Sequence, residues 1–465
     1  MGRYLIVAGL LLYSLISTAQ EFDPYPPTAI PDRIMLNLTS SPSRSIAVTW
    51  RTALFVDEGF VEIAPADPTP QFTENAWAIE ADRSTLVSDQ NAAHYFSAII
   101  DDLQPETTYA YRVGDSLHWS EWNQFTTASK DEKPFSFIYF GDAQNDIKSM
   151  WSRAIRGAFR EMPKAQFMLH AGDLINHRNR DSEWGEWYYA GGWIYSMVPS
   201  IATPGNHEYG RDKDGDYSVT EHWNHLFTLP ENGPGPKRFD GTTYYLDYEN
   251  TRIISFDAPA FYRSEEDKRI LVDWLTKVLQ NNSQKWTVLT LHYPIYSTRF
   301  GRDNKELREA IQPLLQTYHV DLVLQGHDHT YGRGTNMPIG MEHILDGPMY
   351  VVSVSGPKMY DLGFDAWLQR AGSNLQLYQI ITIDGNAMHY QAFTVDNQLY
   401  DAFELYKEDG HNLFFDLAPS DRQEALDLPP RYDINWDKDD LKDYHSRFKD
   451  YLKRKKSDKK DSSGN

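Results

Sequence analysis

Five apolar runs of strand length, each followed within a few residues by a side chain that can bind a metal ion, constrain this chain more than any other feature. The runs occupy residues 135–140, 165–170, 197–202, 286–291 and 320–325. The side chains that follow them are Asp142, Asp173, Asn206, His292, His327 and His329. Because the carboxyl ends of neighbouring strands in an open α/β sheet meet in one crevice, these side chains are expected to lie together. The pattern predicts an α/β domain with a metal site at its strand ends.

The mixture of carboxylate, imidazole and amide donors indicates the kind of ion. Zn, Mn and Fe accept such mixed sets, whereas a site built only of oxygen ligands would favour Ca or Mg. Gathering these groups without a cation would leave buried polar atoms unpaired, which is costly. The ligands suffice for two transition-metal ions that share one carboxylate. The chain contains no cysteine, which excludes thiolate ligands, a cysteine nucleophile and disulfides.

Composition and patterning divide the chain into segments. Residues 27–128 show short alternating stretches between turn residues, which predicts an all-β sandwich. Residues 133–400 alternate strand-length apolar runs with amphipathic helical stretches, as in an α/β domain. Residues 401–465 form a predicted C-terminal extension, with a docked helix whose apolar face carries Tyr444 and Tyr451. The Lys-rich end from Lys453 is predicted to be disordered.

The first nineteen residues have the features of a cleaved signal peptide. A charged start at Arg3 precedes an apolar stretch over residues 4–16 and small residues at 17–19. The alternative is an apolar first helix of the fold. The signal interpretation predicts a secreted or periplasmic protein. A net charge of -21 repels phosphate backbones and anionic lipid surfaces, so we expect neither nucleic acid nor membrane as a partner.

These motifs resemble those of the calcineurin-like metallophosphoesterases and, among them, the purple acid phosphatases. The blocks that carry the resemblance begin at Gly141, Gly172, Gly205, Leu291 and Gly326. Residues 103–111 are also similar to a signature of fibronectin type III domains. The resemblance implies a metallophosphoesterase domain of two packed β-sheets flanked by helices. An all-β sandwich of the fibronectin or immunoglobulin type would precede it.

The resemblance also implies a role for each ligand. Asp173 would bridge the two ions, and Asp142 with His329 would bind the first. The second would be bound by Asn206, His292 and His327.

Two positions depart from the family pattern. Purple acid phosphatases have a tyrosine where this chain has Asn176, and other metallophosphoesterases have a histidine where it has Gln144. The third ligand of the first ion is therefore left open between Gln144, Asn176 and the neighbouring His177. Without a tyrosinate, a divalent ion suits the first site better than ferric iron, and Fe, Zn and Mn are the candidate metals.

The function implied is hydrolysis of small-molecule phosphate esters, most simply of monoesters, with a hydroxide bridging the two ions as the attacking group. His207 is the candidate general acid, with support of a ligand as its alternative role. Arg299 and Arg302 are candidate phosphate-binding residues, with solvated surface arginines as the alternative. Two other functions remain open: a phosphodiesterase or nucleotidase with the same metals, and a non-catalytic surface binding protein.

Overall fold

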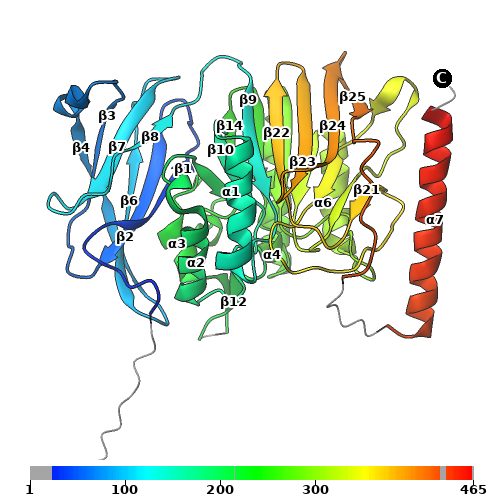
Figure 1. Ribbon diagram of the computed structural model, residues 1–465, viewed down its shortest axis with the longest axis horizontal. Helices are drawn as coiled ribbons and strands as arrows, with labels where there is room; N and C mark the ends of the chain where they lie inside the picture. The colour runs from blue at the N-terminus through cyan, green and yellow to red at the C-terminus, as the bar shows by residue number, and fades with distance from the viewer. Residues whose placement is uncertain (1–22, 214, 430–435, 463–465) are drawn as a thin grey trace, which may run out of the picture.

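A computed structural model of the chain describes residues 23–213, 215–429 and 436–462. The predicted signal peptide lies outside the described residues. An N-terminal β-domain, a larger α/β domain and the C-terminal helix α7 follow one another along the long axis (Figure 1). Within the described part of the chain, no helix has both the length and the hydrophobicity needed to cross a bilayer.

The N-terminal domain is a sandwich of two antiparallel sheets. One contains β1 (Asp32–Leu38), β2 (Ile46–Ala53), β6 (Ala92–Ile100) and β5 (Asp82–Val87). The other contains β4 (Trp77–Glu80), β3 (Phe60–Pro65), β7 (Thr108–Gly114) and β8 (Asn123–Thr126). Trp50 and Phe96 stack in the buried core with ring centroids 5.4 Å apart.

A twelve-stranded sheet joins the two domains. Its order is β19-β25-β24-β23-β22-β9-β10-β11-β1-β2-β6-β5. The α/β domain contributes β9 (Phe135–Phe140), β10 (Phe167–His170), β11 (Ser200–Ala202), β19 (Ile344–Leu345), β22 (Leu377–Asp384), β23 (Ala387–Thr394), β24 (Leu399–Glu408) and β25 (His411–Asp416). The junction is the parallel pairing of β1 with β11 at Asn37 and Ser200. Asn37 also donates a side-chain hydrogen bond to Ser200 O, so the boundary between the domains is paired rather than loose.

A second, seven-stranded sheet completes the α/β domain. It contains β14 (Tyr244–Tyr248), β15 (Thr251–Ser255), β16 (Trp286–Leu291), β17 (Leu322–Gln325), β20 (Met349–Val352), β18 (Tyr331–Gly334) and β21 (Leu368–Gly372), in that order. The remaining elements are the β12 (Tyr209–Arg211) and β13 (Tyr217–Val219) hairpin and the short helices α3 (Glu221–Leu226) and α4 (Ala258–Phe261).

Helices cover both sheets. Buried residues of α1 (Ser152–Glu161) and α2 (Asp181–Gly191) join the core of the twelve-stranded sheet. Those of α5 (Glu265–Gln280) and α6 (Lys305–Thr317) join the core of the seven-stranded sheet. The amphipathic pattern explains α5: Leu271 and Leu275 face the sheet, and the Ser264 side chain caps the first turn. The predicted fold class, two packed sheets flanked by helices behind an all-β sandwich, is confirmed.

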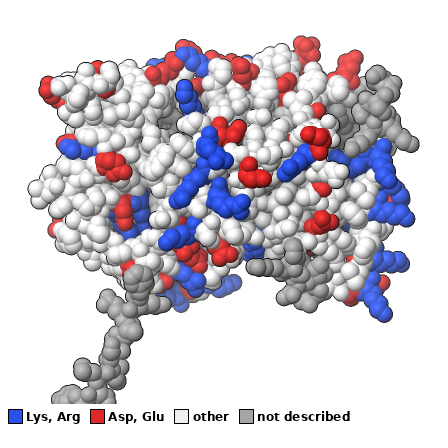
Figure 2. Space-filling model, viewed as in Figure 1, with Lys and Arg blue, Asp and Glu red and all other residues white. Residues whose placement is uncertain are grey.

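The C-terminal region differs from the sequence prediction in two ways. Strand β24 crosses the predicted boundary at residue 400, because β23, β24 and β25 pair as consecutive antiparallel strands. Helix α7 (Lys438–Ser462) continues through the segment expected to be disordered from Lys453. Arg454 donates to the Asp365 carbonyl and Lys455 to the Gln369 carbonyl, so basic side chains of this segment hold it to the domain. In Figure 2 basic side chains line α7 at the right edge of the molecule.

Candidate metal centre

The six predicted ligands come from the carboxyl ends of strands in both sheets of the α/β domain. Three of them, Asp142, Asp173 and Asn206, follow β9, β10 and β11 of the twelve-stranded sheet. The others, His292, His327 and His329, follow β16 and β17 of the seven-stranded sheet. The ligands therefore meet where the two sheets face each other, rather than along one sheet as the sequence pattern suggested.

Two clusters of potential ligand atoms share one carboxylate. Ligand atoms of Asp173, His292 and His327 lie within 4.8 Å of one another, and so do those of Asp142, Asp173 and His329. Asp173 belongs to both clusters, which is the position that a bridging ligand needs. Each cluster suits one transition-metal ion by its donor types. The ligand roles themselves stay a prediction.

Two amide oxygens also fit a site for cations. Gln144 Oε1 and Asn206 Oδ1 are buried and have no hydrogen-bond partner. A buried carbonyl oxygen without a partner is unfavourable unless something positive faces it. Both amides are expected ligands by sequence, so these oxygens are available to bind the ions.

Backbone carbonyls orient three imidazoles. His292 Nδ1 lies 2.8 Å from the Ala171 carbonyl oxygen, and His329 Nδ1 lies 3.0 Å from that of Lys358. His207 Nδ1 lies 2.6 Å from the Asn176 carbonyl oxygen. In each case Nδ1 donates its proton to the carbonyl oxygen, which turns Nε2 toward an aspartate of the cluster. This is the usual way in which a protein fixes the tautomer of a metal-binding histidine.

The backbone at the ligands is strained. Asp142, Asp173, His327 and His329 have positive φ angles of 32°, 52°, 76° and 48°. Non-glycine residues seldom adopt this region, and each such residue costs about 1–3 kcal/mol. Neighbouring glycines permit close approach: a Cβ added at Gly326 would lie 2.7 Å from Asp142 Oδ2. Strain concentrated on the predicted ligands indicates that the fold is built around this site.

Burial and neighbouring charges shift the pKa values of the predicted ligands in different directions. Burial raises the pKa of Asp142 well above its usual value. Burial also opposes ionisation of Asp173, but the adjacent His292 lowers the pKa of Asp173 below its usual value. Burial opposes protonation of His292, yet Asp173 raises its pKa to about 9. Burial lowers the pKa of His327 and of His329, which keeps both imidazoles neutral and able to bind a cation.

Of the three residues that the sequence offers as third ligand of the first ion, one is buried beside the first cluster. Gln144 is fully buried, and its Nε2 lies 2.9 Å from His329 Nε2. Exchanging the oxygen and nitrogen of this amide would turn Oε1 toward the same place. Asn176 and His177 are held elsewhere: the Glu183 carboxylate accepts a backbone hydrogen bond from each of them and contacts the His177 ring. The structure thus places Gln144 against a cluster histidine and the His177 ring against Glu183.

The candidate catalytic and substrate residues lie at the rim of the cluster. His207 Nε2 is 3.9 Å from Asp173 Oδ2, and its side chain is a quarter exposed. Arg302 Nη1 donates to the His327 carbonyl oxygen at 3.0 Å and to Asp328 at 2.7 Å, so it also holds a ligand turn. The Arg299 guanidinium lies 4.0 Å from the centre of the Tyr360 ring.

The sequence reasoning missed several supporting residues. Glu208 accepts hydrogen bonds from the backbone N–H groups of Asp173, Leu174 and Gly205, and burial raises its pKa to about 7. Its position directly after Asn206 and His207 is the sequence feature that could have identified Glu208 as a supporting residue. Tyr360 lies outside the five motifs, yet its ring centroid is 4.8 Å from that of His329. No local pattern marks it, because the contact depends on how a distant loop folds back.

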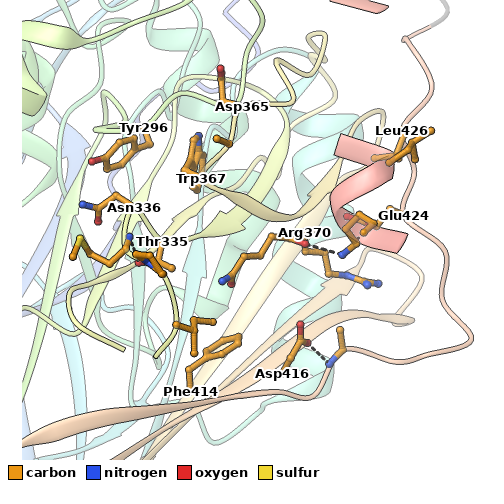
Figure 3. Close-up of a pocket in the computed structure, with 18 of the residues that line it drawn as sticks. Tyr296, Thr335, Asn336, Asp365, Trp367, Arg370, Phe414, Asp416, Glu424 and Leu426 are labelled. Atoms are coloured by element: carbon orange, nitrogen blue, oxygen red, sulfur yellow. Dashed lines mark hydrogen bonds and ion pairs between the residues drawn. The ribbon is translucent and has the colours of Figure 1, made fainter. Parts of the chain in front are cut away.

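A cavity of about 2030 Å³ lies apart from the cluster, between the segment that precedes α7 and the seven-stranded sheet (Figure 3). Trp367 and Arg370 line one side, and Glu424 and Leu426 line the other. Among the described residues, no predicted metal ligand lines this cavity, although Arg302 does. The metal cluster and this cavity are therefore separate features.

Comparison with known proteins agrees with both domains. Residues 31–127 match the purple acid phosphatase N-terminal domain, and residues 135–331 match the calcineurin-like phosphoesterases. Purple acid phosphatase 15 of Arabidopsis thaliana is 27% identical over 70% of this chain and 68% of its own length. Purple acid phosphatase 21 of the same plant is 28% identical over 55% of this chain, and the match spans only 57% of that protein. A relative named "Probable inactive purple acid phosphatase 1" is 24% identical over 60% of this chain and 49% of its own length.

A solved structure shares the fold. The purple acid phosphatase PPD1 from yellow lupin seeds superimposes with a TM-score of 0.69 at 19% identity, over 82% of this chain and 75% of that one. The chain thus contains a calcineurin-like phosphoesterase domain, a type of domain found in metal-dependent phosphoric ester hydrolases. Its organisation is purple acid phosphatase-like, since the N-terminal domain of that family precedes the phosphoesterase domain.

Proposed function

We propose that the protein hydrolyses phosphate monoesters with two transition-metal ions held by the predicted ligands. The main support is the pair of ligand clusters that share Asp173. The names of the relatives do not decide activity, because phosphatases and a protein named as probably inactive match at similar identity. What supports catalysis is that the six strand-end ligands implied by the family resemblance are all present in this chain.

Each residue has a defined task in this proposal. Two bound cations would supply an activated water and neutralise charge on the phosphoryl oxygens. Asp173 and the three histidines hold them in place. As the water oxygen bonds to phosphorus, the bond to the leaving oxygen breaks, and His207 donates the proton that this oxygen needs. Arg302 lies close enough to His327 to orient a phosphoryl oxygen with its guanidinium.

The identity of the metals follows from the ligand charge. Gln144 offers a neutral oxygen where a tyrosinate would offer a negative one. We propose divalent Zn, Mn or Fe in the first site, because a ferric ion gains most from an anionic hard ligand.

Export and the type of the N-terminal domain also belong to the proposal. The charged and apolar start of the chain supports secretion or transfer to a periplasm. Two facing antiparallel sheets over residues 32–126 support a fibronectin-type sandwich. N-terminal sequencing of the mature protein should begin near residue 20, and a retained Met1 would contradict export.

The decisive experiment combines metal analysis with two substrates. We expect one to two transition-metal ions per chain and hydrolysis of p-nitrophenyl phosphate in preference to its bis ester. A chelator should abolish the activity, and Zn, Mn or Fe should restore it. Asp173→Asn should lose both metal and activity, whereas Asp101→Asn, at an exposed turn, should keep both. Preference for the bis ester would indicate a phosphodiesterase, and a metal-loaded protein inactive on both would indicate a binding protein.

A further inference from the structure

Three tyrosines from separate segments form a group next to the second cluster, in which one contacts the histidines and the other two contact that tyrosine. Tyr293 follows His292 directly, and its ring centroid is 4.5 Å from that of His327. Tyr262, at the end of α4, lies 5.8 Å from Tyr293 with the rings inclined by 62°. Tyr217 on β13 is hydrogen-bonded to the Tyr293 side chain. We call Tyr217, Tyr262 and Tyr293 the tyrosine wall.

The tyrosine wall is accessible and held in place. Tyr262 is 41% exposed, whereas Tyr209 next to the wall is only 5% exposed. Tyr217 and Tyr293 are half-buried. The Leu307 backbone N–H donates to the Tyr262 hydroxyl, so this ring is fixed from behind. Rings fixed in advance lose little conformational freedom when a ligand packs on them, which makes them effective binding surfaces.

The tyrosine wall lies on the side of the metal site where the leaving alcohol is expected. His327 is a predicted ligand of the second ion, and the β12–β13 hairpin that carries Tyr217 begins two residues after His207. His207 Nε2 faces Asp173 at 3.9 Å. In the proposed reaction His207 gives its proton to the leaving oxygen. The organic part of the ester must then lie on the side of the site where the hairpin and the wall stand.

We infer that the tyrosine wall is the leaving-group subsite and that it selects phosphate esters whose alcohol carries a planar aromatic group, such as a nucleobase or an aryl ring. This inference rests on the proposed hydrolysis and names its substrate class. The wall presents ring faces and edges, on which flat π-systems stack well and flexible polyols do not. Stacking of one base on an aromatic side chain strengthens binding by about fivefold or more.

The test uses ester pairs that share the same kind of leaving alcohol. Adenosine 5′-monophosphate and ribose 5-phosphate both release a primary alcohol and differ in the base. Benzyl phosphate and cyclohexylmethyl phosphate form the corresponding aryl pair. We expect kcat/KM to favour the aromatic member at least about fivefold, the ratio that 1 kcal/mol represents. Preference in the first pair alone assigns a nucleobase, and preference in the second alone assigns an aryl group.

Substitutions test whether the tyrosine wall causes the preference for the aromatic ester of each pair. Tyr262→Ala should lower the ratio toward one, Tyr262→Phe should keep it, and Tyr189→Ala, at an exposed position on α2, should leave it unchanged. Equal loss for both members of a pair in Tyr262→Ala would overturn the inference, as would a ratio near one in the unchanged protein.

A binding measurement separates this inference from the proposed function. Saturation-transfer NMR with adenosine, which has no ester to hydrolyse, and the zinc-loaded protein should transfer magnetisation to the base protons, and Tyr262→Ala should abolish the transfer. If no ester is hydrolysed, the proposed function fails, and the NMR result alone decides for or against the subsite. Absence of transfer in the unchanged protein would count against the subsite even if the enzyme were active.

Discussion

The predicted ligands combine strained backbone with buried charge, and each of these would destabilise the protein without a cation. Asp142 and Asp173 both adopt positive φ, and both carboxyls are almost fully buried. Such features persist where the surrounding structure enforces them and where function requires them. Cations would compensate the buried charge, so metal binding and folding stability should be linked.

Gln144 is the residue at which the first site can be strengthened. Gln144→His would replace a neutral oxygen by an imidazole nitrogen next to His329, which Zn and other borderline ions prefer. We expect the affinity of the first site for Zn to rise roughly tenfold, equivalent to about 1.4 kcal/mol. Competition with a chelator measures this affinity. Gln144→Ala, which removes the amide oxygen, should have the opposite effect, and unchanged affinity in both variants would exclude Gln144 as a ligand.

Asn176 determines the expected colour. Asparagine carries an amide in place of the tyrosine of the purple acid phosphatases, so no phenolate reaches the ion from this position. The iron-loaded protein should therefore lack the visible charge-transfer band that a tyrosinate produces on ferric iron. Absorption spectra of the unchanged protein and of Asn176→Tyr check this. A purple unchanged protein would mean that a different tyrosine is a ligand.

Helix α7 packs on two loops, one of which carries the substrate candidates. Phe364 contacts Tyr444, Phe448 and Tyr451 of α7, with ring centroids 4.9–5.5 Å apart. The loop of Phe364 pairs with the one that follows His292, since the Gly363 N–H donates to the Thr298 carbonyl at 2.6 Å. This second loop carries Arg299 and Arg302. Packing of α7 thus holds both loops in one arrangement.

Removing the buried anchor of α7 should weaken substrate binding. Tyr451 is fully buried, and its hydroxyl donates to Glu424. Truncating a buried aromatic side chain costs about 3–5 kcal/mol, which is enough to detach a single helix. Tyr451→Ala should raise KM at least about threefold, because misplaced positioning residues weaken substrate binding, while the metal content stays constant. Limited proteolysis should cut α7 faster, and Lys449→Ala, at an exposed position, should change neither property.

The elements that the sequence predicted well are those with a local signal. The runs before Asp142 and His292 show as apolar strands, and the residue types at their ends indicated metal ligands. His177 and Gln144 were equal candidates by sequence, and no local pattern indicates that the His177 imidazole contacts Glu183, six residues further along the chain. The helical end of α7 depends on contacts with Asp365 and Gln369 that no local pattern encodes.

At the scale of the whole molecule, the two domains share a sheet and a buried ion network. Strand β1 joins both parts of the twelve-stranded sheet. Arg33 from β1 binds Asp181 at the start of α2 through two hydrogen bonds of 2.7 and 2.8 Å. Arg51 from β2 lies 3.4 Å from the same carboxylate. Because each partner is buried, the orientation of the domains depends on all three charges being present.

Asp181 should make this connection sensitive to acid. Burial opposes its ionisation, but the nearby His222 and the charge of Arg33 outweigh burial and lower the pKa of Asp181 below its usual value. A lowered folded-state pKa adds stability that is complete above the unfolded-state pKa of about 3.9 and is lost as the pH falls toward the folded-state pKa. Asp181→Asn leaves the buried Arg33 without its carboxylate, whereas Arg51 keeps its ion pair with Asp32, and should reduce the free energy of unfolding at pH 7 by about 3–5 kcal/mol. Urea unfolding of the unchanged protein and of Asp181→Asn should show this difference in the free energy of unfolding at pH 7. The difference should become smaller below about pH 4. The control Asp273→Asn, exposed on α5, should match the unchanged protein at every pH. A difference that stays constant from pH 7 to pH 3 would show that the ionised carboxylate of Asp181 is not what joins the domains.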